Sequence, residues 1–431
     1  MLFLLFGTHL YFTVRLRFIQ RKIPEGIRLS FPRGGGRERE NGISSYAALA
    51  MALAATIGTG NIVGISTAIA VGGPGAVFWC WLTGVFGIAT CYAESFLAVK
   101  YRKKRSDGNC CGGPMYVLEY GLHRKGMAVA FALFTVLASL GIGSSVQAHS
   151  IRVAVDRQVE VSPHLVGIAV GVLAGMVIVG GNKKIAGVCT WLVPVMSAFY
   201  LGGCLWVIGK NIAALPETLV LILRSAFSSR AVCGGLAGGG MLLAMRTGIS
   251  RGLFTNEAGL GSIPMTAGAS GEVSPVCQGM ISMTGPFWDT VVMCAITGIA
   301  AVSSMICHPK AYQNVKPDYL CFVTFGELPV GGELILSISL VLFAFATIIG
   351  WNVYGTSAVR YLWGEEAVRG YQILYMVFVY LGAVLSLDLV WGISDLFNSF
   401  MAIPNLLSLW MLRETVIKES IVKLYAGNNK R

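Results

Sequence analysis

Polar residues and glycines interrupt an apolar stretch at residues 54–61, which reads AATIGTGN. Gly58 and Gly60 weaken a helix interior, while Thr56, Thr59 and Asn61 bring side-chain oxygens into a stretch that has few others. A helix that unwinds here frees N–H groups, which suit a carboxylate, and carbonyl oxygens, which suit a sodium ion. These residues are therefore the first candidate for a binding site.

A second interruption lies at residues 234–240, which read GGLAGGG. So many glycines make a poor helix interior. Glycine is also common where membrane helices pack closely, so either interruption taken alone fits simple packing. The two occupy matching positions, each in the first apolar block of one half of the chain, and this match favours a site between two broken helices.

The elements that carry these stretches must lie in a membrane. Of the 431 residues, 55% are hydrophobic and 13% are charged, whereas a soluble domain usually carries about 25% charged residues. Lipid must therefore be the solvent for most of the surface. The net charge of +12 is not evidence for nucleic-acid binding, because the basic residues stand between apolar blocks and not on one polar face.

Apolar blocks that are long enough to cross or nearly cross a bilayer follow one another along the chain. We assign them to about 2–14, 46–70, 75–100, 127–150, 163–181, 186–209, 233–250, 278–304, 332–359, 371–387 and 391–412. The first is a short spanning or interfacial helix, followed by a polar connector. A stretch at about 214–227 is amphipathic and predicts a surface helix.

The ten blocks after the connector divide into two sets of five. An odd number in each set gives the two halves opposite orientations, which is the plan of an inverted repeat. The predicted divisions are an N-terminal helix with a basic cytoplasmic connector, a first five-helix repeat, a surface helix with a second five-helix repeat, and a cytoplasmic tail: 1–45, 46–209, 210–413 and 414–431. Most of the 33 lysines and arginines fall in one set of alternate loops, so the C-terminus is predicted to be cytoplasmic.

Several motifs together resemble the alanine or glycine:cation symporter family, the sodium:alanine symporters. They are GTGNI at 58–62, GGPG at 72–75 with FW at 78–79, YAE at 92–94, GGPMY at 112–116, RGLFTNEAGLGS at 251–262, GW at 350–351 and MAIPN at 401–405. The resemblance implies an all-α membrane protein with the five-plus-five inverted-repeat fold of the leucine transporter, a core of ten helices preceded by one extra N-terminal helix. It also implies uptake of alanine or glycine driven by sodium, less often by protons.

The resemblance assigns residues to a substrate pocket. Thr59, Gly60 and Asn61 match the family's broken first core helix and are expected to hold the backbone of an amino acid. Gln147 matches a glutamine that lines the pocket, and Trp351 matches a tryptophan that closes it and limits the substrate side chain to about a methyl group. Gly235 and Leu236 are the expected contribution of the second broken helix, although Leu236 stands where a phenylalanine is expected.

The resemblance also implies a sodium site. Thr347 matches a hydroxyl that coordinates the ion with carbonyls of the first core helix, and we add Thr56 and the backbone of Ala55. Ala346 stands where the family commonly has a second hydroxyl, which leaves the affinity for sodium and the identity of the ion open.

Acidic residues inside the apolar blocks form a separate group of candidates. A charge in the membrane interior costs about 2.5–3.5 kcal/mol or more, so each acid needs a partner, a proton or an ion. Asp289, beside Thr290, fits a cation site or a proton relay. Glu94 and Glu257 are interpreted as structural locks that pair with basic residues such as Arg251. Asp395 is interpreted in the same way.

The function predicted from the sequence is secondary active import of a small neutral amino acid, alanine or glycine in the D or L form, with Na⁺ as coupling ion and alternating access. The protein is expected to be a monomer in the lipid bilayer of a bacterial inner membrane. Coupling to H⁺ is the main alternative, and a channel or scaffold is a further one. An enzyme is not expected, because the five histidines are scattered and no metal motif is present.

Overall fold

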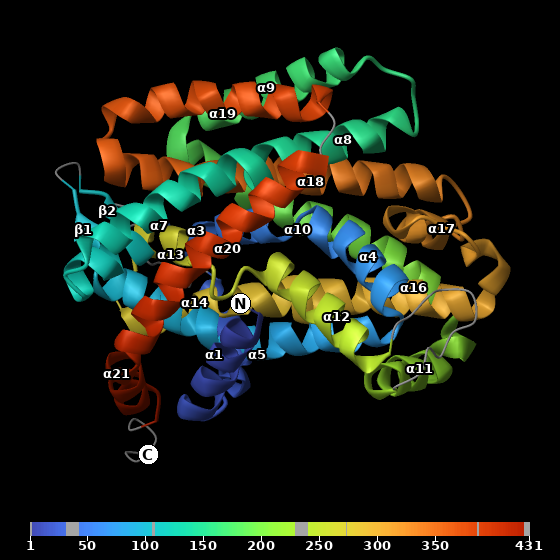
Figure 1. Cartoon of the computed structure of the whole chain (residues 1–431), viewed down its shortest axis with the longest axis horizontal. Helices are drawn as coiled ribbons and strands as arrows, with labels where there is room; N and C mark the ends of the chain where they lie inside the picture. The colour runs from blue at the N-terminus through green and yellow to red at the C-terminus, as the bar shows by residue number, and fades with distance from the viewer. Residues whose placement is uncertain are drawn as a thin grey trace.

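A computed structural model describes residues 2–31, 43–105, 108–228, 240–272, 274–385 and 388–425, without the side chains of 388–395. Apart from one pair of two-residue strands, its regular elements are helices, most of them running along the long axis of the molecule (Figure 1). Helices α9 and α19 pack together along one edge of the bundle, and α1 and α21 lie toward the opposite edge.

The N-terminal segment and the first half of the chain contain these elements in order: α1 (Leu2–Arg15), η1 (Ile19–Lys22), α2 (Ile23–Ser30), α3 (Ser45–Thr56), η2 (Thr59–Asn61), α4 (Val63–Gly72), α5 (Gly75–Lys100), β1 (Lys103–Lys104), β2 (Cys110–Cys111), α6 (Pro114–Tyr116), η3 (Val117–Gly121), α7 (Lys125–Ala138), η4 (Ser139–Ser145), α8 (Val146–Asp156), α9 (Pro163–Ile178) and α10 (Gly181–Lys210). The strands β1 and β2 pair in antiparallel fashion. The segments η3 and η4 are π-helical.

The second half contains η5 (Ile212–Ala214), α11 (Leu215–Phe227), α12 (Met241–Asn256), α13 (Ile263–Ala269), α14 (Pro275–Ser282), α15 (Thr284–Pro286), the π-helical η6 (Phe287–Cys294), α16 (Ala295–Cys307), η7 (Pro309–Tyr312), η8 (Pro317–Tyr319), α17 (Leu320–Phe325), α18 (Gly332–Trp363), α19 (Glu366–Val384), α20 (Asp388–Met411) and α21 (Arg413–Tyr425). The helix predicted at about 214–227 is present as α11, and its place at the membrane surface stays a prediction.

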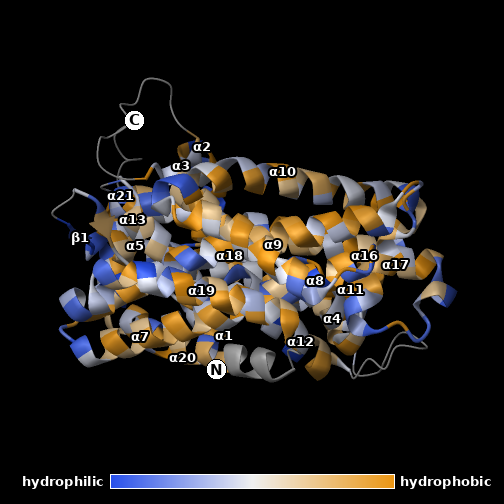
Figure 2. Cartoon of the chain, turned by 90° about the horizontal axis from the view of Figure 1, so that it is seen from above, coloured by the Kyte–Doolittle hydropathy of each residue, from blue (hydrophilic) through white to orange (hydrophobic). Residues whose placement is uncertain are grey.

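Length and composition identify membrane spans among the described residues. Six helices are long and apolar enough to cross a membrane, and the number rises to eight if each of two bent helix pairs is one span. Large apolar side chains on α9 and α10 point outward, among them Leu173, Met176 and Trp191. Figure 2 shows apolar residues along the middles of the helices and hydrophilic residues gathered toward the two ends of the bundle. The predicted total of eleven membrane helices stays a prediction.

Two helices near the centre of the molecule are broken, and their halves pack against each other. The first is the predicted one: α3 ends at Thr56, and the chain resumes as η2 and α4 after a bend of 58°. The second break follows α12, where Glu257, Gly259 and Gly261 have positive φ angles of 53°, 89° and 87°. Helix α3 contacts α13, and α4 contacts α12. The two breaks therefore lie side by side.

The sequence-based expectation for the second break concerned residues 234–240. Of these, 234–239 lie outside the described residues. The break that the structure does describe lies further along, within 257–262, in the run that carries the family resemblance. Two of its left-handed positions hold glycine, which has no Cβ to oppose that conformation.

Candidate functional site

The first break frees main-chain groups inside the molecule. The helical hydrogen-bond ladder of α3 continues to the bond from Ile57 N–H to the Leu53 carbonyl. The next amide, Gly58 N–H, turns away and donates to Oδ1 of Asn61 at 2.9 Å. Among the described residues, no backbone bond reaches the carbonyls of Ala55 or Thr56 from the two amides that would follow in a continuous helix. These carbonyl oxygens are available as ligands for a cation.

Helix α18 approaches the break on one side through Thr347. A Cβ atom placed on Gly58 would lie 2.6 Å from Oγ1 of Thr347, and one placed on Gly350 would lie 2.7 Å from the backbone N of Ala55. The Thr347 hydroxyl donates to the Phe343 carbonyl of its own helix at 2.9 Å. Since its hydrogen is used there, the oxygen lone pairs remain to accept or to coordinate.

Thr56 adds a second hydroxyl at the end of α3. Its Oγ1 is buried and has no hydrogen-bond partner within the described part of the chain, which is rare for a buried polar atom and asks for an explanation. Ala346, beside Thr347, is fully buried and has no oxygen to offer. The structure thus gathers Ala55, Thr56 and Thr347, the residues predicted for the ion, around one break.

The segment from α7 to α8 reaches the break from another side. Thr59 donates from Oγ1 to Oε1 of Gln147 at 3.2 Å, and Gln147 Nε2 donates to the Ile142 carbonyl in the π-helical η4 at 3.1 Å. A π-helical turn leaves a carbonyl out of the regular ladder, which is why such turns occur at functional sites. The predicted pair Thr59 and Gln147 is therefore brought together.

Trp351 is 1% exposed and lies on α18 one helical turn after Thr347. A Cβ atom on Gly143 would lie 2.5 Å from the Trp351 Cβ, so the glycine in η4 leaves room for the tryptophan. The indole stacks edge-on against Tyr354, with ring centroids 5.4 Å apart. The predicted Trp351 thus faces the same π-helical turn that anchors Gln147. The remaining two predicted pocket residues, Gly235 and Leu236, lie outside the described residues.

Asn61 connects the break to a buried acid that the predicted site did not include. Its Nδ2 donates to Oδ1 of Asp289 at 2.7 Å and lies 3.1 Å from the Asp289 carbonyl. Thr290 Oγ1 lies 2.7 Å from the other carboxylate oxygen. All three side chains are fully buried. Asp289 lies in the π-helical η6. Its contact with Asn61 therefore coincides with an irregular stretch of helix.

The second break is held by neutral donors. Ser262 Oγ donates to Oε2 of Glu257 at 2.5 Å, and Asn405 Nδ2 donates to Oε1 of Glu94 at 2.5 Å and to the Gly259 carbonyl at 2.9 Å. The interpretation that Glu94 and Glu257 pair with Arg251 is wrong: no ion pair of these acids is present among the described residues. Short-range hydroxyl and amide donors contact both carboxylates instead, although Oε2 of Glu94 has no hydrogen-bond partner within the described part of the chain. The side chain of Asp395 lies outside the described residues.

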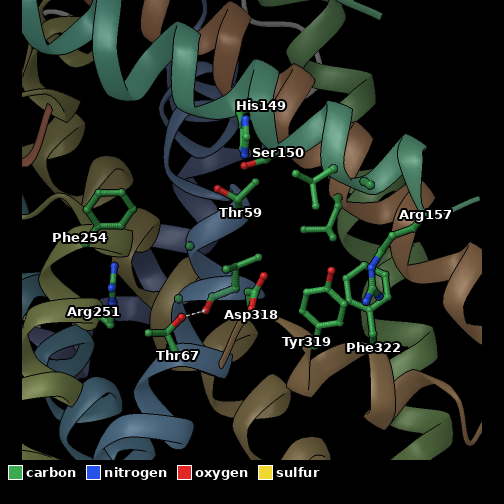
Figure 3. Close-up of a pocket in the computed structure, with 16 residues that line it drawn as sticks. Thr59, Thr67, His149, Ser150, Arg157, Arg251, Phe254, Asp318, Tyr319 and Phe322 are labelled. Carbon is green, nitrogen blue, oxygen red and sulfur yellow. Dashed lines mark hydrogen bonds between the residues drawn. The ribbon is translucent and has the colours of Figure 1, made fainter. Parts of the chain in front are cut away.

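A pocket of about 300 Å³ opens onto the first break. Thr59 and Gly60 form part of its lining, with His149 and Ser150 of α8 nearby (Figure 3). Arg157 lies on one side, its guanidinium carbon 3.7 Å from the ring centroids of both Tyr319 and Phe322. Arg251 and Phe254 lie on the other side; these and the other labelled residues can be followed in Figure 3.

The sequence matches the sodium:alanine symporter family over residues 1–431. The chain belongs to this family. It is 41% identical over 425 residues to the sodium/alanine symporter AgcS of Methanococcus maripaludis, covering 97% of this chain and 93% of AgcS. It is 34% identical over 418 residues to the probable sodium/glutamine symporter GlnT of Bacillus subtilis, covering 96% and 85%. The family is one of membrane transporters, so its member described here is a multi-pass membrane transporter and not an enzyme.

The fold of this family member is similar to that of MhsT, solved in complex with L-phenylalanine. The TM-score is 0.60 at 14% sequence identity, over 87% of this chain and 90% of MhsT. MhsT has the leucine-transporter fold, so the predicted fold class is confirmed at that level. The division into two inverted repeats of five helices stays a prediction.

Proposed function

We propose that this transporter imports a small neutral amino acid together with Na⁺ by alternating access. The observation that carries the proposal is the close approach of Thr347 to the first break, beside carbonyl oxygens that the break frees from helical bonding. Hard cations take oxygen ligands. Ala55, Thr56 and Thr347 would supply two hydroxyls and a main-chain carbonyl at the first break.

The substrate of the proposed symporter binds next to the ion, at Thr59, Gly60 and Asn61. Free N–H groups at the start of a helical turn attract a carboxylate, and the pocket reaches Thr59 and Gly60. Gln147 supplies an amide, and Trp351 restricts the space for a side chain. We infer alanine or glycine, in either the D or the L form, from this restriction and from the name of the relative AgcS.

The orientation follows from charge, and the membrane and the oligomeric state are part of the same proposal. The basic residues gathered in one set of loops place the C-terminus in the cytoplasm under the positive-inside rule, in a bacterial inner membrane, and the transporter is proposed to act as a monomer. H⁺ coupling is the second candidate, favoured by Ala346, which lacks the hydroxyl that would complete a sodium site.

Uptake of labelled alanine into proteoliposomes tests the proposal. We expect accumulation under an inward Na⁺ gradient at equal pH, and none with K⁺ in its place. Accumulation under a pH gradient without Na⁺ would support the second candidate. The absence of uptake under either gradient would refute symport.

A further inference from the structure

Three carboxylates are buried near the two breaks, and Asp289 is the one that accepts a hydrogen bond from Asn61 of the predicted substrate site. Asp289 is fully buried, whereas Glu94 is 2% and Glu257 3% exposed. Among the described residues, none of the three forms an ion pair. An unpaired charge buried at this depth costs on the order of several kcal/mol. A proton or a cation must therefore occupy Asp289 for at least part of the time.

The space around Asp289 favours the proton. Asp289 is not in the lining of the pocket at the first break, nor of two further pockets in the described part of the chain. Side chains fill the neighbourhood: a Cβ atom on Gly84 would lie 2.7 Å from Thr290, and one on Gly60 would lie 2.6 Å from Cγ2 of Thr255. A sodium ion needs several oxygen ligands around it, whereas a proton needs only one acceptor.

A row of hydroxyls gives the proton a place in the hydrogen-bond network. Oδ2 of Asp289 lies 2.7 Å from Thr290 Oγ1, which lies 3.5 Å from Thr255 Oγ1. With a charged Asp289, the Thr290 hydroxyl donates to the carboxylate. With a neutral Asp289, the carboxylic acid donates to Thr290, whose hydrogen turns toward Thr255. The charged state is satisfied by the observed geometry, whereas the neutral state needs the two threonine hydroxyls to approach, since 3.5 Å is long for a hydrogen bond between oxygens.

Asn61 links this acid to the substrate. Its Oδ1 is held by Gly58 N–H, and its Nδ2 faces Asp289. A substrate that engages the Asn61 amide changes the donor available to the carboxylate, and linkage is reciprocal: proton occupancy must then change the affinity for substrate.

We propose that Asp289 is a proton-binding site whose occupancy is linked to substrate binding through Asn61. The inference rests on the proposed function, because it requires the substrate to bind at Asn61. The other ionisable side chains near Asp289 are Cys294 on η6 itself and Glu257 in the second break. Cys80 on α5 lies beside Cys294, and Glu94 on α5 lies near Glu257. Arg251 lies against Gly64 and lines the pocket.

Isothermal titration of the purified full chain with alanine tests the site. Titrations at saturating Na⁺ and equal pH, in buffers of different ionisation enthalpy, give the number of protons exchanged per alanine as the slope of binding enthalpy against buffer enthalpy. We expect a non-zero slope for the wild type at some pH at which the protein is folded. In Asp289→Asn the slope is expected to fall to zero for the alanine that still binds.

Two further variants keep the proposal testable if Asp289→Asn does not fold. Thr290→Val keeps the side-chain shape but removes the hydroxyl, so it is expected to move the pH at which the slope is largest. Glu94→Gln is the matched control, because it neutralises a neighbouring buried acid outside the substrate site. Its slope is expected to equal that of the wild type.

Four results would overturn the inference. They are a zero slope for the wild type at every pH, a slope that persists in Asp289→Asn, an unchanged pH profile in Thr290→Val, and loss of the slope in Glu94→Gln. If the wild type shows a zero slope and alanine binding depends less on Na⁺ in Asp289→Asn than in the wild type, Asp289 is part of a cation site instead. Failure of the proposed function looks different: no alanine binds at all.

Discussion

The side-chain amide of Asn61 joins the first helix break to a buried acid, with Nδ2 2.7 Å from Oδ1 of Asp289. The other end of the amide accepts Gly58 N–H at 2.9 Å. The donor and the acceptor of one side chain are thus both used, which fixes its orientation. Asn61 therefore holds the shape of the break as well as lying where the substrate is proposed to bind.

Replacing Asn61 by alanine removes both contacts. Each buried group left unsatisfied is expected to lower the free energy of unfolding by about 1–3 kcal/mol. Thermal unfolding of the purified protein and alanine binding measure the two effects, and both stability and binding are expected to fall. Gln313→Ala, at an exposed loop position, is the control. Wild-type stability and alanine affinity in Asn61→Ala would contradict the role given to this side chain.

Trp351 is predicted to set the size of the accepted side chain. Its Cβ lies against the position that a Cβ on Gly143 would take, so the indole fills the space beside η4. Trp351→Phe leaves a smaller ring and is expected to raise uptake of larger neutral amino acids relative to alanine. Competition of labelled alanine uptake by a panel of amino acids measures this ratio. The control Trp191→Phe, at a position 68% exposed on α10, should leave this ratio unchanged. An unchanged ratio in Trp351→Phe would mean that another residue closes the pocket.

Gly58 is predicted to be required for the ion site because a larger residue would push Thr347 away. The added Cβ of Gly58→Ala would lie 2.6 Å from the Thr347 oxygen, too close for an unshifted neighbour. The Na⁺ concentration for half-maximal alanine uptake is expected to rise about tenfold, which corresponds to about 1.4 kcal/mol. Gly171→Ala adds the same methyl group where nothing lies within 4 Å. Equal Na⁺ dependence in the two variants would argue against a site beside Gly58.

Asn405 is predicted to stabilise the second break. It donates to both Glu94 and the Gly259 carbonyl, so Asn405→Ala leaves a buried carboxylate and a buried carbonyl with fewer donors. The expected loss is about 1–3 kcal/mol for each group, seen as a lower unfolding temperature. The conservative Asn405→Gln tests whether geometry matters as well as chemistry. Unfolding at the wild-type temperature in Asn405→Ala would show that the break is held by other contacts.

The first break was predictable from the sequence because its signal is local. Gly58, Gly60 and Asn61 stand within four positions in an apolar stretch, and glycine with polar side chains is a poor helix interior. The long helices were also predictable from hydropathy: α5, predicted at 75–100, spans Gly75–Lys100, and α10, predicted at 186–209, spans Gly181–Lys210. Such patterns depend only on neighbours along the chain.

The contacts across the site were not predictable in the same way. Asn61 and Asp289 are 228 positions apart, and no periodicity links them. The second described break was missed, although Gly259 and Gly261 after Asn256 and Glu257 form a signal like that at 58–61. The expectation for Glu94 and Glu257 was wrong because charge alone suggested arginine, whereas Ser262 and Asn405 lie close enough to donate.

The dependence of alanine binding on Na⁺ in Thr347→Val tests the central proposal most directly, namely that a cation binds where α18 meets the first break. Thr347→Val keeps the shape of the side chain and removes the oxygen beside Gly58. Thr356→Val makes the same change on the same helix, at a buried residue that donates to Asn352. We predict that Na⁺ raises alanine affinity in the wild type and in Thr356→Val, and that this response is lost in Thr347→Val. An equal response to Na⁺ in all three proteins would contradict the proposed ion site.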